Sequence, residues 1–155
     1  MVATEVESTD EKTLDYIASK VFAQMRSLTS KPAWKIADFR SIVYSLYWLA
    51  DAGHLVLFKD SNDKMIGVLA YDIESPWYSK FTCFEEIFVL GLDPSFVGFG
   101  RIALKWMKKK AKDSGCALFE TGASMTDQPE LLENLYKRHG RCTFSYPNFV
   151  WVLPN

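Results

Sequence analysis

Two glycines separated by one residue, Gly98 and Gly100, open a basic amphipathic stretch of the chain. A strand-like run comes before them and a helical pattern follows, so their backbone lies where a helix begins. The first N–H groups of a helix have no acceptor within it, and glycine lets an anion approach them without a side chain in the way. The helix dipole also favours negative charge there. The spacing predicts a phosphate site, with a pyrophosphate as its natural ligand.

The same glycines allow a second interpretation, a dinucleotide-binding fingerprint. Gly98, Gly100 and Ala103 satisfy G-x-G-x-x-A. Glu120 follows at about the distance at which that motif places an acid for a ribose hydroxyl. However, the fingerprint needs its first glycine directly after a strand, whereas residues 93–97 intervene, and little chain follows for a parallel sheet. No G-K-[ST] follows either, which argues against a nucleoside triphosphate with magnesium. Dinucleotide binding is kept as a less favoured alternative.

Hydrophobic periodicity predicts the elements that must hold this turn. Apolar residues three and four apart indicate four helices, and apolar runs bounded by turn residues indicate strands. The helices cover residues 14–28, 36–50, 99–111 and 127–140, and the strands cover 54–60, 65–73, 82–92, 116–124 and 142–153. Asp127 and Glu130 form a capping-box pattern for the last helix, and no strand is evident in residues 1–9. We predict one α+β domain over residues 1–155, with residues 1–10 flexible.

Charge and composition limit the classes of partner. Eighteen Lys and Arg stand against 19 Asp and Glu, so the net charge of −1 provides no overall field for nucleic acid, which is a disfavoured partner. No apolar stretch is long enough for a membrane span and no signal-peptide pattern opens the chain, so we expect a cytoplasmic protein without a membrane partner. Cys83, Cys116 and Cys142 lack metal-ligand spacing, and we predict no metal site.

The order of these elements and two segments of the sequence resemble the GNAT superfamily of acetyl-coenzyme A-dependent N-acyltransferases. The segment "GFGRIALKWMKKKAKDSGC", residues 98–116, is similar to the glycine turn, long helix and closing glycine of the family. The segment "NLYKRHG", residues 134–140, is similar to its tyrosine, basic pair and glycine before the last strand. The resemblance covers residues 11–153. It implies a mixed, mostly antiparallel central sheet flanked by four helices, and acetyl-CoA as acyl donor.

The resemblance also implies how the acyl donor is held. The pyrophosphate would lie on residues 97–101, and the strand before the turn would pair its backbone with the pantetheine arm. Counting from Gly98 selects residues 88–90 for this pairing and counting from Pro94 selects residues 90–92; we favour the first. The residues that we place against the cofactor are Phe88, Val89, Leu90, Ser95, Phe96, Val97, Gly98, Phe99, Gly100 and Arg101.

Acetyl transfer to an amine needs a group that takes the amine proton. Glu85 and Glu86 are adjacent on a predicted strand and therefore face opposite sides of the sheet, so only one can face a cleft. Partial burial would raise its pKa toward neutrality, which suits a general base. By the resemblance we choose Glu86, whose parity fits the position where some members of the family carry a base, and keep Glu85 second, while two exposed carboxylates without a catalytic role remain an open alternative. By the resemblance, Tyr136 is the donor that hydrogen-bonds the departing thiolate.

These inferences predict an N-acetyltransferase that moves an acetyl group from acetyl-CoA to a primary amine by direct attack in a ternary complex. The acceptor is an amine-bearing molecule of open identity, and the aromatic strand predicted at 142–153 could pair with a second copy to form a homodimer. Ser95 stands where the family usually has Gln or Arg, and Pro94 lies closer to the glycines than usual. This departure motivates the alternative, a catalytically inactive GNAT-fold protein that serves as a binding or assembly module.

Overall fold

The computed structural model describes residues 1–29, 36–122 and 125–140. Its elements are β1 Val2–Glu5, α1 Glu11–Ser27, α2 Phe39–Asp51, β2 Leu55–Lys59, β3 Met65–Glu74, β4 Cys83–Gly91, α3 Phe99–Asp113, β5 Leu118–Glu120, α4 Pro129–Leu135 and the π-helical η2 Tyr136–Gly140. The strand predicted at 142–153, with the homodimer contact placed on it, lies outside the described residues, as does Cys142. None of the helices described has the length and apolarity needed to cross a membrane.

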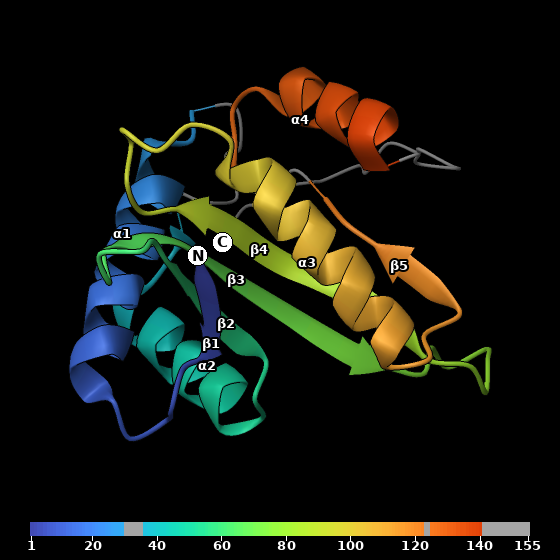
Figure 1. The fold of residues 1–155 in the computed structure, drawn as a ribbon. Coiled ribbons are helices and arrows are strands. Elements are labelled where there is room, and N and C mark those ends of the chain that lie inside the picture. Colours follow the sequence, from blue (N-terminus) through green and yellow to red (C-terminus); the bar gives the residue numbers. More distant parts are fainter. Residues whose placement is uncertain (30–35, 123–124, 141–155) are drawn as a thin grey trace.

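The strands form one sheet in the order in which they occur in the chain, β1-β2-β3-β4-β5 (Figure 1). Every neighbouring pair is antiparallel except β4 and β5, which are parallel and are joined through α3. The prediction of an α+β fold with a mixed, mostly antiparallel sheet and four helices is confirmed for the described residues. A dinucleotide-binding fold needs a largely parallel sheet, which this order of strands does not provide.

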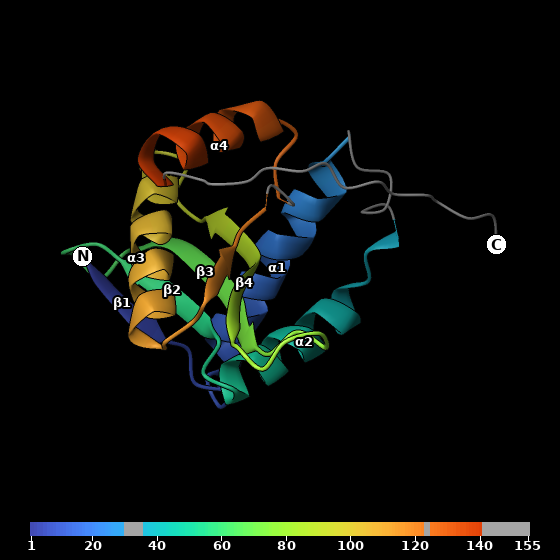
Figure 2. The ribbon, with the colours of Figure 1, turned by 90° about the vertical axis from the view of Figure 1, so that its right-hand side faces the viewer.

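Helices cover both faces of the sheet. In Figure 2, α3 lies on one side of the strands, and α1 and α2 lie on the other. Each face carries a hydrophobic core, built around Tyr71, Phe84 and Met107 on the α3 side and around Ile17 and Leu46 on the other side. The apolar stripe of each helix therefore packs on the sheet, as its periodicity indicates. α4 lies near the beginning of α3 in both views (Figures 1 and 2).

The first strand was not anticipated. Residues 2–5 form β1 and pair with β2, whereas the sequence indicated no strand before residue 10. β1 is an edge strand of the sheet, and all four of its residues are exposed to solvent. An edge strand of this kind has no alternation of apolar and polar residues by which it could be recognised.

The start of α4 also differs from the prediction. Gln128 is the N-cap residue of α4 and its side chain makes no capping hydrogen bond, while its backbone N–H donates to the hydroxyl of Thr126 at 3.0 Å. Asp127 instead accepts a hydrogen bond from the backbone N–H of Thr29, at 3.0 Å. The capping-box prediction was therefore wrong, because Asp127 joins the segment before α4 to the end of α1.

At the beginning of α3, the ring of Phe99 packs directly on the backbone of Gly67 in the sheet. Phe99, the first residue of α3, is buried at 6% exposure. A Cβ placed on Gly67 of β3 would lie 2.2 Å from Cζ of Phe99, a distance at which atoms overlap. Gly67 is therefore required so that the ring can lie on the strand, and this contact sets where the glycine turn sits relative to β4.

Candidate active site

β4 and β5 run side by side for a short distance and then separate. Residues 83–85 of β4 pair with residues 118–120 of β5, where β5 ends. β4 continues to Gly91, and its other edge stays paired with β3 as far as Gly67. The edge of β4 from Glu86 to Gly91 therefore has no partner from β5. An extended ligand can bind along such an edge through its own hydrogen-bonding groups.

A β-bulge decides which face of the sheet Glu86 occupies. The register of β4 with β3 passes from Tyr71↔Glu86 to Ala70↔Phe88, so Ile87 is an extra residue. Glu86 consequently shares the α3 face with its partner Tyr71, whereas Phe88 packs into the core under α1 and α2. Bulges often re-aim side chains next to functional sites, and this one lies where β4 and β5 separate.

Two hydroxyl groups from distant parts of the chain meet on Glu86. The Tyr136 hydroxyl donates a hydrogen bond to Glu86 Oε2 at 3.0 Å, and the Thr121 hydroxyl donates to the same oxygen. The backbone N–H of Gly122 is a further donor to this carboxylate. Tyr136 is the first residue of η2, directly after α4, and Thr121 directly follows β5. Three elements therefore converge on one carboxylate at the point where the two strands separate.

The burial of this group of residues changes its acid–base properties. Burial raises the pKa of Glu86, although the hydrogen bonds from Thr121, Tyr136 and Gly122 act in the opposite direction. Burial also raises the pKa of Tyr136, and the negative charge of Glu86 raises it further. The phenol therefore keeps its proton at neutral pH and acts as a hydrogen-bond donor. A carboxylate whose pKa is raised by burial is a better proton acceptor for catalysis near neutral pH.

The two glycines of the turn have different roles. Gly98 has φ +96°, a conformation that side chains disfavour, and a Cβ there would meet nothing within 4 Å. A Cβ on Gly100 would lie 3.1 Å from Cδ2 of Leu135, so Gly100 allows α4 to approach α3. Gly98 thus permits the backbone path and Gly100 permits the packing that brings η2 close to the turn.

The N–H groups of this turn are available for a ligand. Gly98 caps α3 without a side-chain hydrogen bond, and its carbonyl accepts from the N–H of Arg101 at 3.1 Å. Among the described residues, no backbone carbonyl accepts from the N–H groups of residues 97–100. Donors at the N-terminus of a helix of this length bind anions. The turn therefore has the donors that a pyrophosphate requires.

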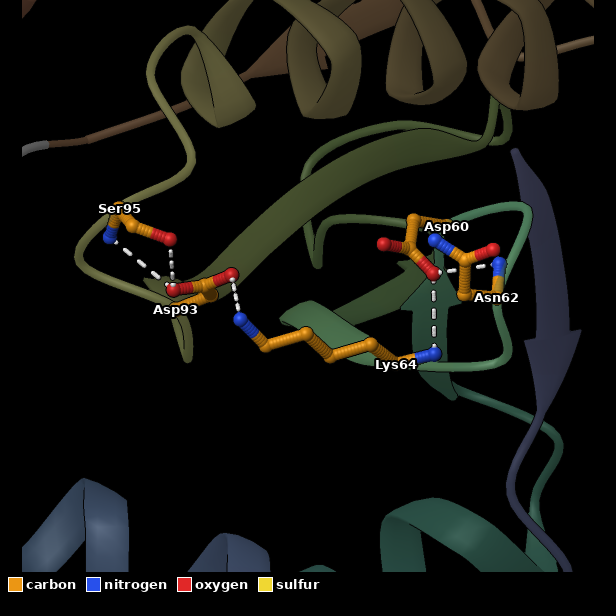
Figure 3. A network of polar contacts seen from close by, with 5 residues as sticks. All are labelled: Asp60, Asn62, Lys64, Asp93 and Ser95. Carbon is orange, nitrogen blue, oxygen red and sulfur yellow. Dashed lines mark hydrogen bonds and ion pairs between the residues drawn. The ribbon is translucent and has the colours of Figure 1, made fainter.

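Ser95 has a structural task in this loop. Its N–H and its hydroxyl donate to Oδ1 of Asp93 at 3.0 and 2.7 Å (Figure 3). Oδ2 of Asp93 lies 2.5 Å from the ammonium of Lys64, whose own N–H donates to Asp60 at 3.0 Å. These contacts connect the loop before α3 to the turn between β2 and β3. The side chain of Ser95 is therefore engaged within the loop.

The other predicted cofactor residues lie on β4 and around the glycine turn. Phe88 and Leu90 are buried and Val89 is half-buried, and all three lie on the part of β4 that β5 does not cover. Phe96 is half-buried against the core on the α3 side. Val97, at 93% exposure, and Arg101 are at the surface beside the turn.

Glu85 is separated from the Glu86–Tyr136 contact. It is exposed on the opposite face of the sheet, in register with Asp72 of β3 and Glu120 of β5. Asp72 also lies 3.2 Å from Nδ1 of His54. The described residues hold no group of three or more side chains suited to a metal ion.

Thr121 is the site residue that reasoning from the sequence missed. Its partner Glu86 is 35 positions away in the chain. The surrounding "FETGAS" reads as the end of a strand, and a threonine there is ordinary for such a segment. The hydroxyl of Thr121 lies next to the carboxylate of Glu86 because β5 separates from β4 at this point.

No family model matches the sequence, and no curated protein sequence matches it. Solved structures do match. The structure of a probable acetyltransferase superposes with a TM-score of 0.71 at 12% identity, covering 100% of this chain and 99% of that one. The chain has the GNAT fold. The ribosomal-protein-alanine N-acetyltransferase of Brucella melitensis biovar Abortus 2308 matches with a TM-score of 0.66 at 12% identity, over 99% of this chain and 100% of that one.

An aminoglycoside acetyltransferase from an uncultured soil metagenomic sample also has this GNAT fold. It matches with a TM-score of 0.65 at 8% identity, over 99% of this chain and 98% of that one. The resemblance to the GNAT superfamily inferred from the glycine turn and the tyrosine segment is therefore confirmed at the level of the fold. At such identities the likeness concerns the fold alone, and the chemistry must be argued from the site.

Proposed function

We propose that this protein is an N-acetyltransferase that transfers an acetyl group from acetyl-CoA to a primary amine. The observation that carries the proposal is the contact between Glu86 and Tyr136. It pairs a half-buried carboxylate of raised pKa with a protonated phenol at the place where β4 and β5 separate. A proton acceptor and a hydrogen-bond donor are the two groups that amine acetylation needs.

Two features of the backbone fit acetyl-CoA. The N–H groups at the beginning of α3 are suited to the pyrophosphate, because no described backbone carbonyl accepts from them and the φ of +96° at Gly98 sets the path of the turn. The edge of β4 that β5 does not cover, with residues 88–90, is suited to the amides of an extended pantetheine arm. When bound, acetyl-CoA supplies an acetyl thioester that an amine can attack.

The side chains then divide the proton chemistry between them. Glu86 takes the proton that the amine must lose as it forms the new C–N bond. Tyr136 donates a hydrogen bond to the sulfur as the C–S bond breaks. Because its pKa is raised, the phenol stabilises the thiolate by hydrogen bonding more readily than by giving up its proton. Holding both partners in one site supplies a large part of the rate enhancement.

The charge distribution favours a cationic amine as acceptor. Asp72, Glu85 and Glu120 form a row of carboxylates across β3, β4 and β5, on the face opposite to Glu86. Such a row would attract an ammonium group toward the end of the sheet at which the site lies. Two of the structural neighbours carry the names of aminoglycoside and ribosomal-protein-alanine acetyltransferases, and both kinds of acceptor offer an amine nitrogen.

The test is a measurement of thiol release from acetyl-CoA with a panel of primary amines: polyamines, aminoglycosides, and peptides with a free N-terminus or lysine. We expect release with at least one amine, and we expect Glu86→Gln to reduce its rate by roughly 10²-fold or more. Glu85→Gln, the adjacent control on the opposite face, should change the rate only a few-fold. Equal losses in the two variants would contradict the assignment. Binding of acetyl-CoA without release by any amine would favour the inactive binding module.

A further inference from the structure

We propose that Thr121 is a positioning residue for Glu86, which holds the carboxylate in place while Tyr136 turns to the departing sulfur. This inference rests on the proposed function, because it assigns a task within the same site. Thr121 is half-buried, and its hydroxyl contacts the oxygen of Glu86 that also accepts from Tyr136. It touches neither cofactor nor acceptor in this role, and acts only through Glu86.

The geometry explains why one oxygen takes both hydroxyls. A carboxylate oxygen accepts about two hydrogen bonds, so Thr121 and Tyr136 together occupy Oε2 of Glu86. The single N–H of Gly122 can occupy only one lone pair of the remaining oxygen. Among the donors of the described residues, none occupies the last lone pair of Oε1, and this oxygen is the atom that we assign to proton transfer.

The two donors differ in what they can do next. Tyr136 has a long side chain at the junction of α4 and η2, and the phenol must change partner to reach a sulfur atom. Thr121 follows β5 directly and has a short side chain, so its hydroxyl stays beside Glu86. Without Thr121, the carboxylate would lose both side-chain donors whenever Tyr136 moved away, and its orientation would be lost with them.

The test follows the ionisation of Glu86 in the complete chain without acetyl-CoA or acceptor. The side-chain carboxyl carbons of ¹³C-glutamate-labelled protein are titrated by NMR, and the resonance missing from Glu86→Gln identifies Glu86. Thr121→Val removes one donor to the charged form, so the titration of Glu86 should move to higher pH. We expect a roughly tenfold change in its protonation constant. Thr121→Ser keeps the hydroxyl and should titrate like the parent protein.

The central comparison is made in the Tyr136→Phe background, which imitates the departure of the phenol. There Thr121→Val should move the titration of Glu86 at least as far as it does in the parent protein. No movement in this background would overturn the inference, and so would a Thr121→Ser variant that behaves like Thr121→Val. This experiment does not measure acetyl transfer. A protein that is inactive with every amine can still show the shift in the titration of Glu86, and an active protein can fail to show it. Failure of this inference and failure of the proposed function are therefore distinguishable.

Discussion

The hydroxyl oxygen of Tyr136 lies 3.0 Å from Oε2 of Glu86, although the two residues are 50 positions apart in the chain. The contact couples their ionisation, since the phenol stabilises the carboxylate and the carboxylate raises the pKa of the phenol. Burial of a carboxylate lowers stability unless hydrogen bonds or an opposite charge offset its lost hydration, and strongly perturbed groups of this kind are common at functional sites. The pair therefore has the character of a functional site. Substitutions in it should lower activity without lowering the stability of the fold.

Glu86→Gln should stabilise the fold while it removes activity. Burial raises the pKa of Glu86 in the folded chain, so its contribution to stability falls as the pH rises from its unfolded pKa, about 4.3, through its folded pKa. Glutamine has no charge to bury and can still accept from Tyr136 and Thr121. We expect a gain of about 0.5–2 kcal/mol at pH 7, measured by thermal unfolding. The gain should vanish at a pH below the unfolded value, and a lower unfolding temperature at pH 7 would contradict the burial argument.

Tyr136→Phe should lower turnover and leave the affinity for acetyl-CoA nearly unchanged. The phenol is proposed to act on the departing sulfur, which develops charge only during the reaction, so about 10–10²-fold should be lost from kcat. The variant also removes a donor to Glu86. The pKa of Glu86 should therefore rise in this variant. Because Glu86 must be ionised to accept a proton, the acidic limb of the pH–rate profile should shift to higher pH. Rate profiles and calorimetry on the same preparation measure both effects, and unchanged turnover would exclude Tyr136 from the mechanism.

Gly67→Ala should weaken the attachment of α3 to the sheet. The new Cβ would lie 2.2 Å from the ring of Phe99, so ring or strand must move, at a cost of about 1–3 kcal/mol. Gly91→Ala is the matched control, because its Cβ would lie 4.0 Å from Cδ1 of the same ring, an ordinary contact. Urea unfolding of the two variants measures the difference. Equal stabilities would mean that Phe99 can relax away from Gly67 freely.

Asp93 should make the fold more stable at neutral pH than in acid. Lys64, followed by Ser95, lowers the pKa of Asp93 to about 2. A lowered pKa contributes stability above the unfolded value of about 3.9, and this is lost as the pH falls toward 2. Asp93→Asn should therefore unfold at a lower temperature than the parent at pH 7, with the difference shrinking between pH 4 and 2. Asp113→Asn, at an exposed pair with Lys109, should show little change, and identical behaviour of the two variants would contradict the role of the loop contacts.

The predictable part of this fold is the part with a strong hydrophobic period. The stripe of α1 and the continuous apolar runs of β2 and β3 bury their side chains as their spacing indicates. β1 has no such period, since it is an exposed edge, and β5 is only three residues long where the sequence indicated nine. Local patterns do not contain the tertiary contacts that end a strand early.

The site divides in the same way. Alternation along β4 separated Glu85 from Glu86, and the resemblance to the GNAT superfamily singled out Tyr136. The bulge at Ile87 and the contact between Thr121 and Glu86 depend on interactions between residues far apart in the chain. Local sequence patterns therefore could not predict them. The hydrogen bonds from Ser95 to Asp93 likewise had no local signal in the sequence.

The most direct test of the account is a calorimetric titration of acetyl-CoA into the parent protein and two variants of Gly98. The backbone there has φ +96°, which asparagine tolerates better than other side chains and valine does not, while the Cβ of either residue would meet nothing within 4 Å. We predict one site per chain in the parent protein, affinity largely kept in Gly98→Asn, and affinity lowered at least about tenfold in Gly98→Val, since strain of about 1–3 kcal/mol would reorient the N–H groups. Absence of binding to the parent protein at millimolar acetyl-CoA, or equal affinity in all three proteins, would contradict the account.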